Sequence, residues 1–308
     1  MIKKYFYNIN YAENECDICR MELKYLFGED IKKKNILSHV NVKMGRSPFL
    51  KEKIEIIIRK NSLREIIDEI SETNLICESY KVVYVKHDGQ TVQYGDRIEA
   101  VKAVGTAITG KAEMHNPKIV YGITQIDDKW IFGKYERDDC KWHSHDKKLH
   151  SYSNAIGLRL SRALINIAVG NDLSLTIIDP CCGVGTVIID GLSMGINIKG
   201  FEKNKQIARN AKENLSHFGY ENVITTSDMR TIKEKFDVAI VDLPYGVFTP
   251  ITEKEQEEII ETTRKIAEKV IFVTFDNMDE IIEEAGFQIV DKCSISKGNF
   301  TRWINICE

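Results

Sequence analysis

The sequence has no apolar run that approaches the ~20 residues needed to cross a bilayer. Its first residues, Met1-Ile2-Lys3-Lys4-Tyr5, also lack the apolar stretch of a secretory signal. The eight cysteines are too sparse in 308 residues for a disulfide scaffold, and we expect them to be free thiols in a reducing compartment. These absences predict a protein of the cytoplasm.

A strong positive charge is missing as well, because the formal net charge is −3 at pH 7. A uniformly basic nucleic-acid binder is therefore excluded, and any RNA contact must come from a local patch. One basic run extends from Lys141 to His150, although such runs are more often solvated surface. Within it Trp142 stands among Lys141, Lys147 and Lys148, which suits phosphate and base contact.

The hydrophobic fraction of 43% and the charged fraction of 29% are those of an ordinary globular protein. A chain of this length fits two domains. The sequence contains no internal repeat and no low-complexity tract. We expect a front region over residues 1–136, a polar linker over 137–153 and a second domain over 154–308.

The second half alternates short Ile- and Val-rich runs with amphipathic stretches, which predicts a parallel sheet covered by helices. The tail departs from this rhythm, because two strand-like runs follow each other without a helix and predict an antiparallel hairpin. The expected helices are Asn154–Ala168, Thr186–Ser193, Lys205–His217, Glu253–Ala267 and Met278–Ala285. The expected strands are Leu175–Asp179, Ile196–Glu202, Val223–Thr226, Phe236–Asp242, Val270–Phe275, Phe287–Ile295 and Thr301–Cys307.

The front half is predicted to be an α+β region that begins with the order strand, helix, strand, strand, helix, strand. This order is that of a ferredoxin-like unit. The expected elements are the strands Lys4–Asn8, Ile36–Val42, Ile54–Arg59 and Val82–Lys86 with the helices Glu13–Phe27 and Leu63–Glu72, followed by a helix over Asp96–Ile108 and strands over Ile119–Thr124 and Trp130–Tyr135.

A candidate cofactor loop, Asp179-Pro-Cys-Cys-Gly-Val-Gly-Thr186, lies where a predicted strand ends and a helix begins. Gly183 and Gly185 allow a tight turn, and the following helix offers free N–H groups to a carboxylate. A glycine pair alone is a weak signal. The third glycine of a dinucleotide fingerprint is missing, which favours S-adenosylmethionine over NAD.

Acidic residues end the next two strands. Glu202, followed by Lys203, is placed to accept hydrogen bonds from ribose hydroxyls. Asp228 can accept from an adenine amino group while Met229 packs on the ring, or it can equally cap the helix that follows. We expect the cofactor to be held by Asp179, Pro180, Cys181, Gly183, Gly185, Thr186, Glu202, Lys203, Asp228, Met229 and Asp242.

The tetrapeptide Asp242-Leu243-Pro244-Tyr245 ends the next strand. Asp242 and the carbonyl of Leu243 or Pro244 can accept the two hydrogens of an exocyclic amine, which returns electron density to its nitrogen. Tyr245 can stack on a base that has been flipped out of its helix. The simpler interpretation, an ordinary turn, loses weight beside the cofactor loop.

The two motifs resemble the Asn/Asp-Pro-Pro-Tyr and Asp-Pro-Phe-Cys-Gly-Ser-Gly-Thr motifs of amino methyltransferases. Together with Gly246 and the segment Leu160–Asn166, they are similar to the tRNA guanine-N2 methyltransferases that carry a THUMP domain. The resemblance implies a Rossmann-like domain that uses S-adenosylmethionine and a THUMP-like front half that binds tRNA. Leu243 departs from the family's proline.

The resemblance implies N2-methylguanosine formation at position 10 or 6 of tRNA, and a small activator protein as a partner in some relatives. Adenine-N6 methylation of DNA or ribosomal RNA stays open, because the tetrapeptide serves any exocyclic amine. A non-catalytic RNA-binding subunit is the remaining alternative. We expect no metal, because Cys16 and Cys19 have no second pair at zinc-ligand spacing.

Overall fold

The computed structural model describes residues 3–152, 155–244, 251–298 and 300–308. The chain forms two compact units, and each contains one seven-stranded sheet. The first unit comprises residues 1–10, 31–45 and 49–139, and the second comprises 11–30, 46–48 and 140–308. Residues 11–30 therefore group with the C-terminal half, whereas the expected division placed them in the front region. No helix of the described ranges has the length and apolar character of a membrane span.

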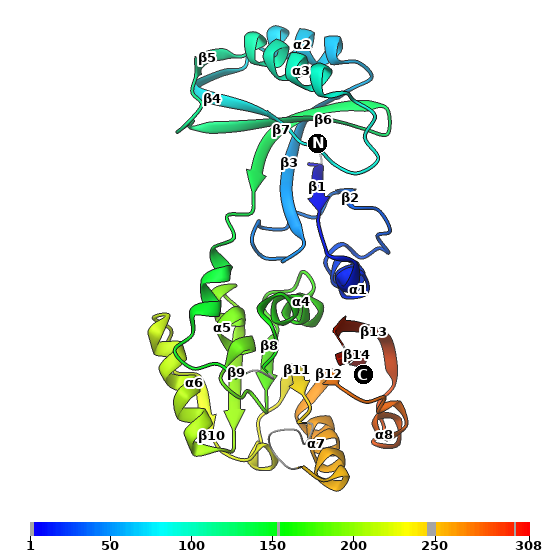
Figure 1. Cartoon of the computed structure of the whole chain (residues 1–308), viewed down its shortest axis with the longest axis vertical. Coiled ribbons are helices and arrows are strands. Elements are labelled where there is room, and N and C mark those ends of the chain that lie inside the picture. The colour runs from blue at the N-terminus through cyan, green and yellow to red at the C-terminus, as the bar shows by residue number, and fades with distance from the viewer. Residues whose placement is uncertain (1–2, 153–154, 245–250, 299) are drawn as a thin grey trace. The chain divides into compact units, whose positions relative to one another are not determined.

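The sheet of the first unit has the order β2-β1-β3-β7-β6-β4-β5. Helices α2 and α3 lie side by side on one face of it (Figure 1), and Ile66, Ile70 and Val104 from these helices pack on Ile123 and Phe132. The elements are β1 (Tyr5–Ile9), β2 (Asn35–Ser38), β3 (Leu50–Lys60), α2 (Leu63–Glu72), β4 (Ile76–Tyr84), α3 (Tyr94–Ala107), β5 (Thr109–Ala112), β6 (Ile119–Ile126) and β7 (Lys129–Arg137).

The ferredoxin-like arrangement expected from the element order is not formed. In a split β-α-β unit the two strands joined by the helix run parallel, with a third strand between them. Here β1 and β2 are direct neighbours and antiparallel, with Phe6 opposite Leu37. The reason is that the intervening helix α1 (Cys16–Phe27) belongs to the second unit and makes no crossover on this sheet.

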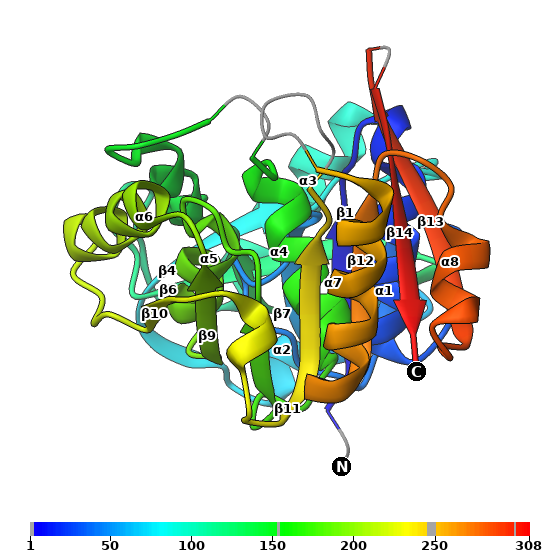
Figure 2. The ribbon, with the colours of Figure 1, turned by 90° about the horizontal axis from the view of Figure 1, so that it is seen from below.

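The sheet of the second unit has the order β10-β9-β8-β11-β12-β14-β13, and the first five strands are parallel. The antiparallel hairpin β13–β14 forms the edge beside β12 (Figure 2), which confirms the predicted Rossmann-like sheet and its unusual ending. The strands are β8 (Thr176–Asp179), β9 (Asn197–Glu202), β10 (Ile224–Thr226), β11 (Phe236–Asp242), β12 (Ala267–Thr274), β13 (Ile289–Lys297) and β14 (Phe300–Cys307).

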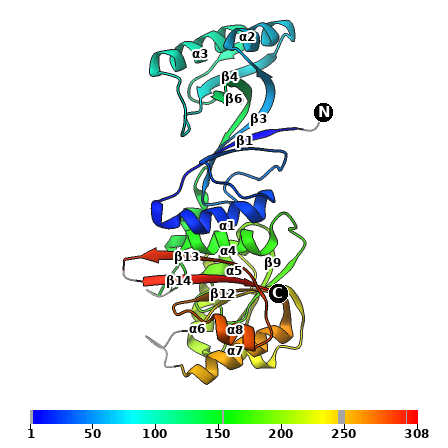
Figure 3. The same cartoon turned by 90° about the vertical axis from the view of Figure 1, so that its right-hand side faces the viewer.

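Helices cover this second sheet, and α1 is one of them. It runs alongside α4 (Leu158–Val169) and contacts β13 (Figure 3). Within the described residues α4 begins at Leu158, later than expected. The remaining helices are α5 (Thr186–Ser193), α6 (Lys205–His217), α7 (Glu253–Ile266) and α8 (Asp279–Glu284), with short 3-10 turns η1 (Glu13–Glu15), η2 (Lys141–Lys147) and η3 (Met229–Thr231).

A buried polar network holds α1 on α4. Glu22 is fully buried and accepts hydrogen bonds from Ser47 Oγ at 2.7 Å and from Asn166 Nδ2 at 2.6 Å. Arg46 Nε donates to Asn166 Oδ1 at 2.9 Å. Burial raises the pKa of Glu22 to about 7. Partners on two other chain segments thus satisfy a carboxyl group that would be costly to bury alone.

Candidate active site

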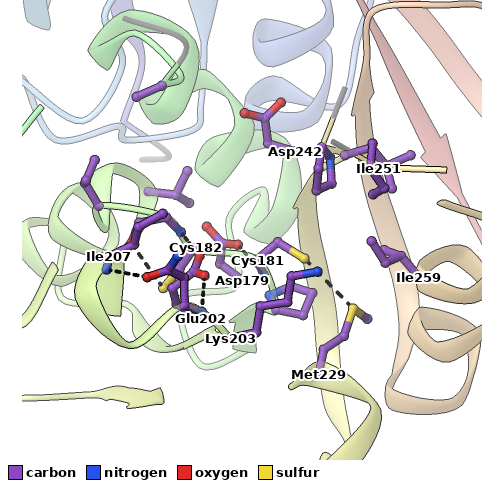
Figure 4. Close-up of a pocket in the computed structure, with 18 of the residues that line it drawn as sticks. Asp179, Cys181, Cys182, Glu202, Lys203, Ile207, Met229, Asp242, Ile251 and Ile259 are labelled. Carbon is purple, nitrogen blue, oxygen red and sulfur yellow. Dashed lines mark hydrogen bonds between the residues drawn. The ribbon is translucent and has the colours of Figure 1, made fainter. Parts of the chain in front are cut away.

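A cavity of about 270 Å³ lies at the carboxyl ends of β8, β9, β10 and β11 in the second unit. Ligands bind at this edge in open α/β sheets. Figure 4 shows Asp179, Glu202 and Asp242 around the cavity, with Asp242 set apart from the other two. The predicted residues that line it are Asp179, Pro180, Cys181, Gly183, Thr186, Glu202, Lys203, Asp228, Met229, Asp242, Leu243 and Pro244.

The loop after β8 turns through two glycines in the left-handed region, Gly183 at φ 52° and Gly185 at φ 81°. Gly185 is the N-cap of α5, and a Cβ atom there would lie 3.4 Å from Leu215 and Ile224. Gly185 is absent from the cavity wall. Its side of the turn faces the packed interior, so its contribution to the site is to let the loop turn.

Glu202, at the end of β9, ties the loop to its neighbouring strand. Its Oε2 accepts the backbone N–H of Gly183 at 3.2 Å, and its Oε1 accepts that of Asn204 at 2.8 Å. Burial raises the pKa of Glu202. A carboxylate oriented by two backbone amides is preorganised to accept further hydrogen bonds from a ligand.

Asp228 is both a cap and a wall of the cavity. It accepts from the backbone N–H of Arg230 at 2.9 Å and from its guanidinium at 2.7 Å, and Arg230 also pairs with Glu258 at 3.0 Å. These contacts lower the pKa of Asp228. Met229 is buried next to it, with Sδ 3.9 Å from Cys181 Sγ. Of the two roles expected for Asp228, the structure therefore contains the capping contact.

Asp242 ends β11 with its Oδ1 atom buried, and that atom has no hydrogen-bond partner among the described residues. Burial raises its pKa to about 7, while the charge of Arg302 opposes the shift. An orphaned carboxyl oxygen in a cavity costs free energy unless a ligand satisfies it. This atom is therefore the clearest sign of a ligand donor in the site.

The residues after Asp242 contribute backbone rather than side chain. Leu243 is 1% exposed and packs in the core with Ile178 and Val241, and its N–H donates to Val273 O at 3.0 Å. The departure from the family's proline therefore falls on a side chain that serves packing. The carbonyl of Pro244 accepts from Gln256 Nε2 at 2.7 Å. Tyr245 and Gly246 lie outside the described residues.

Several carboxyl groups line the cavity. Burial raises the pKa of Asp179 to about 8, and the negative charges of Asp242 and Glu202 add to the shift. Asp179 is buried and accepts the N–H of Cys181 at 3.2 Å. Lys203 supplies a cation on the same wall. Asp179 is buried and Glu202 and Asp242 are partly buried around one cavity, so a ligand with positive charge would stabilise their ionised forms.

The basic run before the second domain is not part of the cavity wall. Trp142 is 4% exposed, with the Arg162 guanidinium 5.3 Å from its ring, so it cannot stack on a base in this conformation. Lys148 is half-buried and donates to Thr186 Oγ1 at 3.2 Å. Lys141 and Lys147 are exposed on η2. The run is thus an integral turn of the second unit, with two of its cations exposed to solvent.

Sequence reasoning missed three kinds of contributor to the site. Gln256, on α7, fixes the carbonyl of Pro244 from a helix that begins eleven residues after Asp242. Ile251 and Ile259 form an apolar wall, and Tyr152 lines the cavity from the segment before α4. No sequence motif marks these residues, because the fold brings them to the cavity from two separate segments, one before α4 and one in and just before α7. Among the described residues, no three His, Cys, Asp or Glu side chains cluster as metal ligands.

A protein-family model described as "UPF0020: RMKL-like, methyltransferase domain" matches residues 148–272. The tRNA (guanine(10)-N2)-dimethyltransferase of Methanothermobacter thermautotrophicus is 25% identical over 210 residues, which are 65% of this chain and 61% of that protein. The enzyme of the same name from Methanocaldococcus jannaschii is 22% identical over 259 residues, 77% of this chain and 73% of that protein. These matches confirm the resemblance predicted from the motifs.

The chain thus spans about three fifths of the Methanothermobacter relative. Among solved structures, TrmN from Thermus thermophilus superimposes with a TM-score of 0.48 at 14% identity, over 99% of both chains. A putative methyltransferase, SMU.472, complexed with SAH gives the same TM-score and identity, over 99% of this chain and 98% of that one.

Proposed function

We propose that this chain, whose residues 148–272 match the UPF0020 methyltransferase-domain family model, transfers the methyl group of S-adenosylmethionine to the exocyclic N2 amine of a guanosine in tRNA. The observation that carries the proposal is Asp242, which lines the same cavity as Glu202 and whose buried Oδ1 has no partner among the described residues. The carboxyl group of Asp242, a hydrogen-bond acceptor, is therefore held in the cavity where Glu202 is proposed to bind the ribose of the cofactor.

The residues of the cavity fit S-adenosylmethionine. Glu202, oriented by the amides of Gly183 and Asn204, would accept the ribose hydroxyls. Met229 and Ile207 offer apolar surface to the adenine, and Asp179 lies under the loop that would hold the amino-acid part. The acidic character of the cavity matches the positive charge of the cofactor. When bound, S-adenosylmethionine supplies an electrophilic methyl group on a sulfonium.

The remaining task of the protein is to make a poor nucleophile reactive. The lone pair of an exocyclic guanine amine is delocalised into the ring. Asp242 accepts one N–H of the amine, and a backbone carbonyl of Leu243 or Pro244 accepts the other, which localises the lone pair and orients it. Gln256 keeps the Pro244 carbonyl in place. The proton released after transfer passes to Asp242 or to water.

The RNA substrate is assigned from the resemblance and the relatives. The two archaeal relatives described above are named for guanine 10 of tRNA, so position 10 is the first position to test. The first unit, as a THUMP-like RNA-binding region, together with the exposed Lys141 and Lys147, would hold the tRNA. The setting proposed for this reaction is the cytoplasm, with a small activator protein as a candidate partner.

The test uses labelled S-adenosylmethionine and unmodified tRNA, with nucleoside analysis of the product. We expect label in N2-methylguanosine or N2,N2-dimethylguanosine, and no label with the Asp242→Ala variant. Label in N6-methyladenosine, or in DNA but not in tRNA, would replace the proposal with the adenine alternative. Binding of tRNA without label in either nucleic acid would indicate a binding subunit.

A further inference from the structure

We propose that Asn214 of α6 is a positioning residue for the cofactor, because it fastens the loop after β8 to residues 148–152 and so holds two walls of the cavity in place. Val184 of the loop and Tyr152 of that segment both line the cavity, whereas Asn214 is absent from the described residues that do. Its effect on the ligand must therefore pass through the groups that it holds. The identity of the ligand, S-adenosylmethionine, is taken from the proposed function, and the role of Asn214 is argued from its contacts.

The side-chain amide of Asn214 makes three hydrogen bonds to the main chain of the described residues. Its Oδ1 accepts the N–H of His150 at 2.9 Å, and its Nδ2 donates to the carbonyl of the same residue at 2.9 Å. Nδ2 also donates to the carbonyl of Val184 at 3.0 Å, which uses both of its hydrogens. Asn214 is fully buried. A buried amide is costly unless it is paired, so these contacts are what allows an asparagine at this position.

The two contacts with His150 resemble a pair of backbone hydrogen bonds between neighbouring strands. An asparagine side chain carries the same C=O and N–H groups as a peptide, and here both bind the main chain of one residue. The contact therefore depends on the backbone at position 150 and not on the imidazole. The imidazole makes a separate contact with Glu213, at 2.7 Å and with both side chains partly exposed.

The cofactor loop needs fastening from outside because of its own residues. Val184 lies between Gly183 at φ 52° and Gly185 at φ 81°. Two glycines give the loop more conformational freedom than other residues would. Glu202 fixes the loop at the N–H of Gly183, and Asn214 fixes it at the carbonyl of Val184. A loop that is ordered before the ligand arrives loses less conformational entropy on binding.

Helix α6 also holds the second wall. Asn210 lies one turn before Asn214, and its Nδ2 donates to the hydroxyl of Tyr152 at 3.0 Å. The Oδ1 atom of Asn210 accepts from Gln206 at 2.9 Å, which keeps its amide oriented. The segment is thus held at His150 by Asn214 and at Tyr152 by Asn210. Since Asn214 also holds the loop, its loss would release the two walls from each other.

The experiment measures the Kd of the full chain for S-adenosylmethionine and for S-adenosylhomocysteine by isothermal titration calorimetry, a measurement that needs no methyl transfer. Asn214→Ala is expected to raise both Kd values roughly 10- to 100-fold. Asn214→Asp keeps the size of the side chain but presents a second acceptor to two carbonyls, so its effect should be at least as large. His150→Ala should change the Kd by less than about threefold, because the backbone contacts stay and only the exposed pair with Glu213 is lost.

Asn166→Ala is the matched control for stability. Asn166 is also fully buried in the second unit, where its Nδ2 donates to Glu22, and it is not among the described residues that line the cavity. Its loss should lower the free energy of unfolding to a similar degree and leave the Kd of the folded protein unchanged. A positioning role also predicts coupling: Tyr152→Ala should raise the Kd much less in the Asn214→Ala background than in the parent, and by the same factor in the Asn166→Ala background.

A Kd for Asn214→Ala within threefold of the parent's would overturn the inference, and so would an equal rise with Asn166→Ala. In the methylation assay the KM for S-adenosylmethionine should rise while kcat at saturating cofactor stays close to the parent's, and a fall in kcat alone would also count against the inference. If cofactor binding depends on Asn214 but no nucleic acid is methylated, the inference stands and the proposed reaction fails. If tRNA is methylated and Asn214 has no effect on the Kd, the reverse holds.

Discussion

The backbone N–H of Gly183 donates to Oε2 of Glu202 across 3.2 Å, so the loop after β8 and the end of β9 form one rigid wall of the cavity. We expect Glu202→Ala to raise the Kd for S-adenosylmethionine by roughly 10- to 100-fold, because it removes both the ligand's acceptor and the tie to the loop. Isothermal titration calorimetry measures this directly. Glu202→Gln keeps an acceptor oxygen, so its Kd for S-adenosylmethionine should lie between that of the parent and that of Glu202→Ala.

A suitable control for this change is Glu234→Ala. Glu234 is an exposed carboxylate that pairs with Lys199 of β9 at 2.7 Å and does not line the cavity. Its loss should leave the Kd unchanged. If both alanine variants weakened binding equally, the effect would come from the stability of β9 and not from the ligand contact.

The rate of methyl transfer should depend on the ionisation of Asp242. Burial raises its pKa to about 7, and only the ionised carboxylate accepts an N–H of the amine with full strength. We therefore expect kcat to rise with pH through about 7 and then level off. Asp242→Asn should remove this dependence and lower kcat by roughly 100-fold or more. Single-turnover rates between pH 5.5 and 9 test both points.

The raised pKa of Asp242 also affects the free energy of unfolding, and there the ionised carboxylate is unfavourable. Because the folded-state pKa of Asp242 is raised from 3.8 to about 7, the folded protein binds more protons than the unfolded chain between these values, and the unfolding free energy falls as pH rises through that range. Asp242→Asn should relieve this cost, so the variant should be more stable than the parent at pH 8 and not at pH 4. Urea unfolding at pH 4 and pH 8 tests this prediction. An equal difference in unfolding free energy between Asp242→Asn and the parent at both pH values would contradict it.

The positive charge of Arg302 should lower the pKa of Asp242. Arg302 lies on β14 with its guanidinium 4.8 Å from the ring of Phe275, and its charge lowers the pKa of Asp242. Arg302→Gln removes that charge, so the acid side of the pH–rate profile should move to higher pH. Arg302→Lys keeps a positive charge and should leave the profile closer to the parent's. An unshifted profile for the glutamine variant would show that Arg302 does not act on Asp242.

The docking of α1 can be tested at Glu22. Glu22→Ala leaves Ser47 Oγ and Asn166 Nδ2 without their buried acceptor, and we expect a loss of roughly 2–4 kcal/mol in the free energy of unfolding. Glu22→Gln keeps an acceptor oxygen and should cost less. Glu29→Ala, at an exposed position just after α1, provides the control in thermal and urea unfolding.

The second sheet was predictable because each strand carries its own signal. Buried parallel strands such as Phe236–Asp242 are continuous apolar runs, and amphipathic helices separate them. Most helices and strands of the first sheet could be predicted, but the pairing of its strands could not. No local sequence pattern predicts that β1 and β2 are antiparallel neighbours. The strand Thr109–Ala112 was missed because all four of its residues are exposed and it has no apolar period.

The segment expected to be a polar linker shows the limit of hydrophobic patterns. His145 is buried, and its Nδ1 lies 2.8 Å from Asp190 Oδ1, which also accepts from Arg162 at 3.0 Å. Polar side chains that hydrogen-bond to one another can be buried inside a protein, although their sequence pattern predicts an exposed segment. Trp142 was predicted to contact RNA for the same reason. Its neighbours in sequence are charged, and they give no indication that its own side chain is buried.

In the site, the strand-end residues could be predicted, since a doubly wound sheet gathers the carboxyl ends of its strands at one edge. Asp179, Glu202 and Asp242 do line one cavity. The unsatisfied oxygen of Asp242 and the hydrogen bond from Gln256 to the Pro244 carbonyl could not be predicted, because both depend on tertiary packing.

The three-segment composition of the second unit has a consequence for how the protein is made. Helix α1 ends at Phe27, but its packing partner α4 extends from Leu158 to Val169. At ribosomal rates of about 5–20 residues per second, the apolar face of α1 waits roughly 7 to 28 seconds for that partner. During this interval residues 31–45 and 49–139 can fold as an inserted unit. The packing of α1 on α4 can therefore form only after the segment 31–139 that separates them has been made.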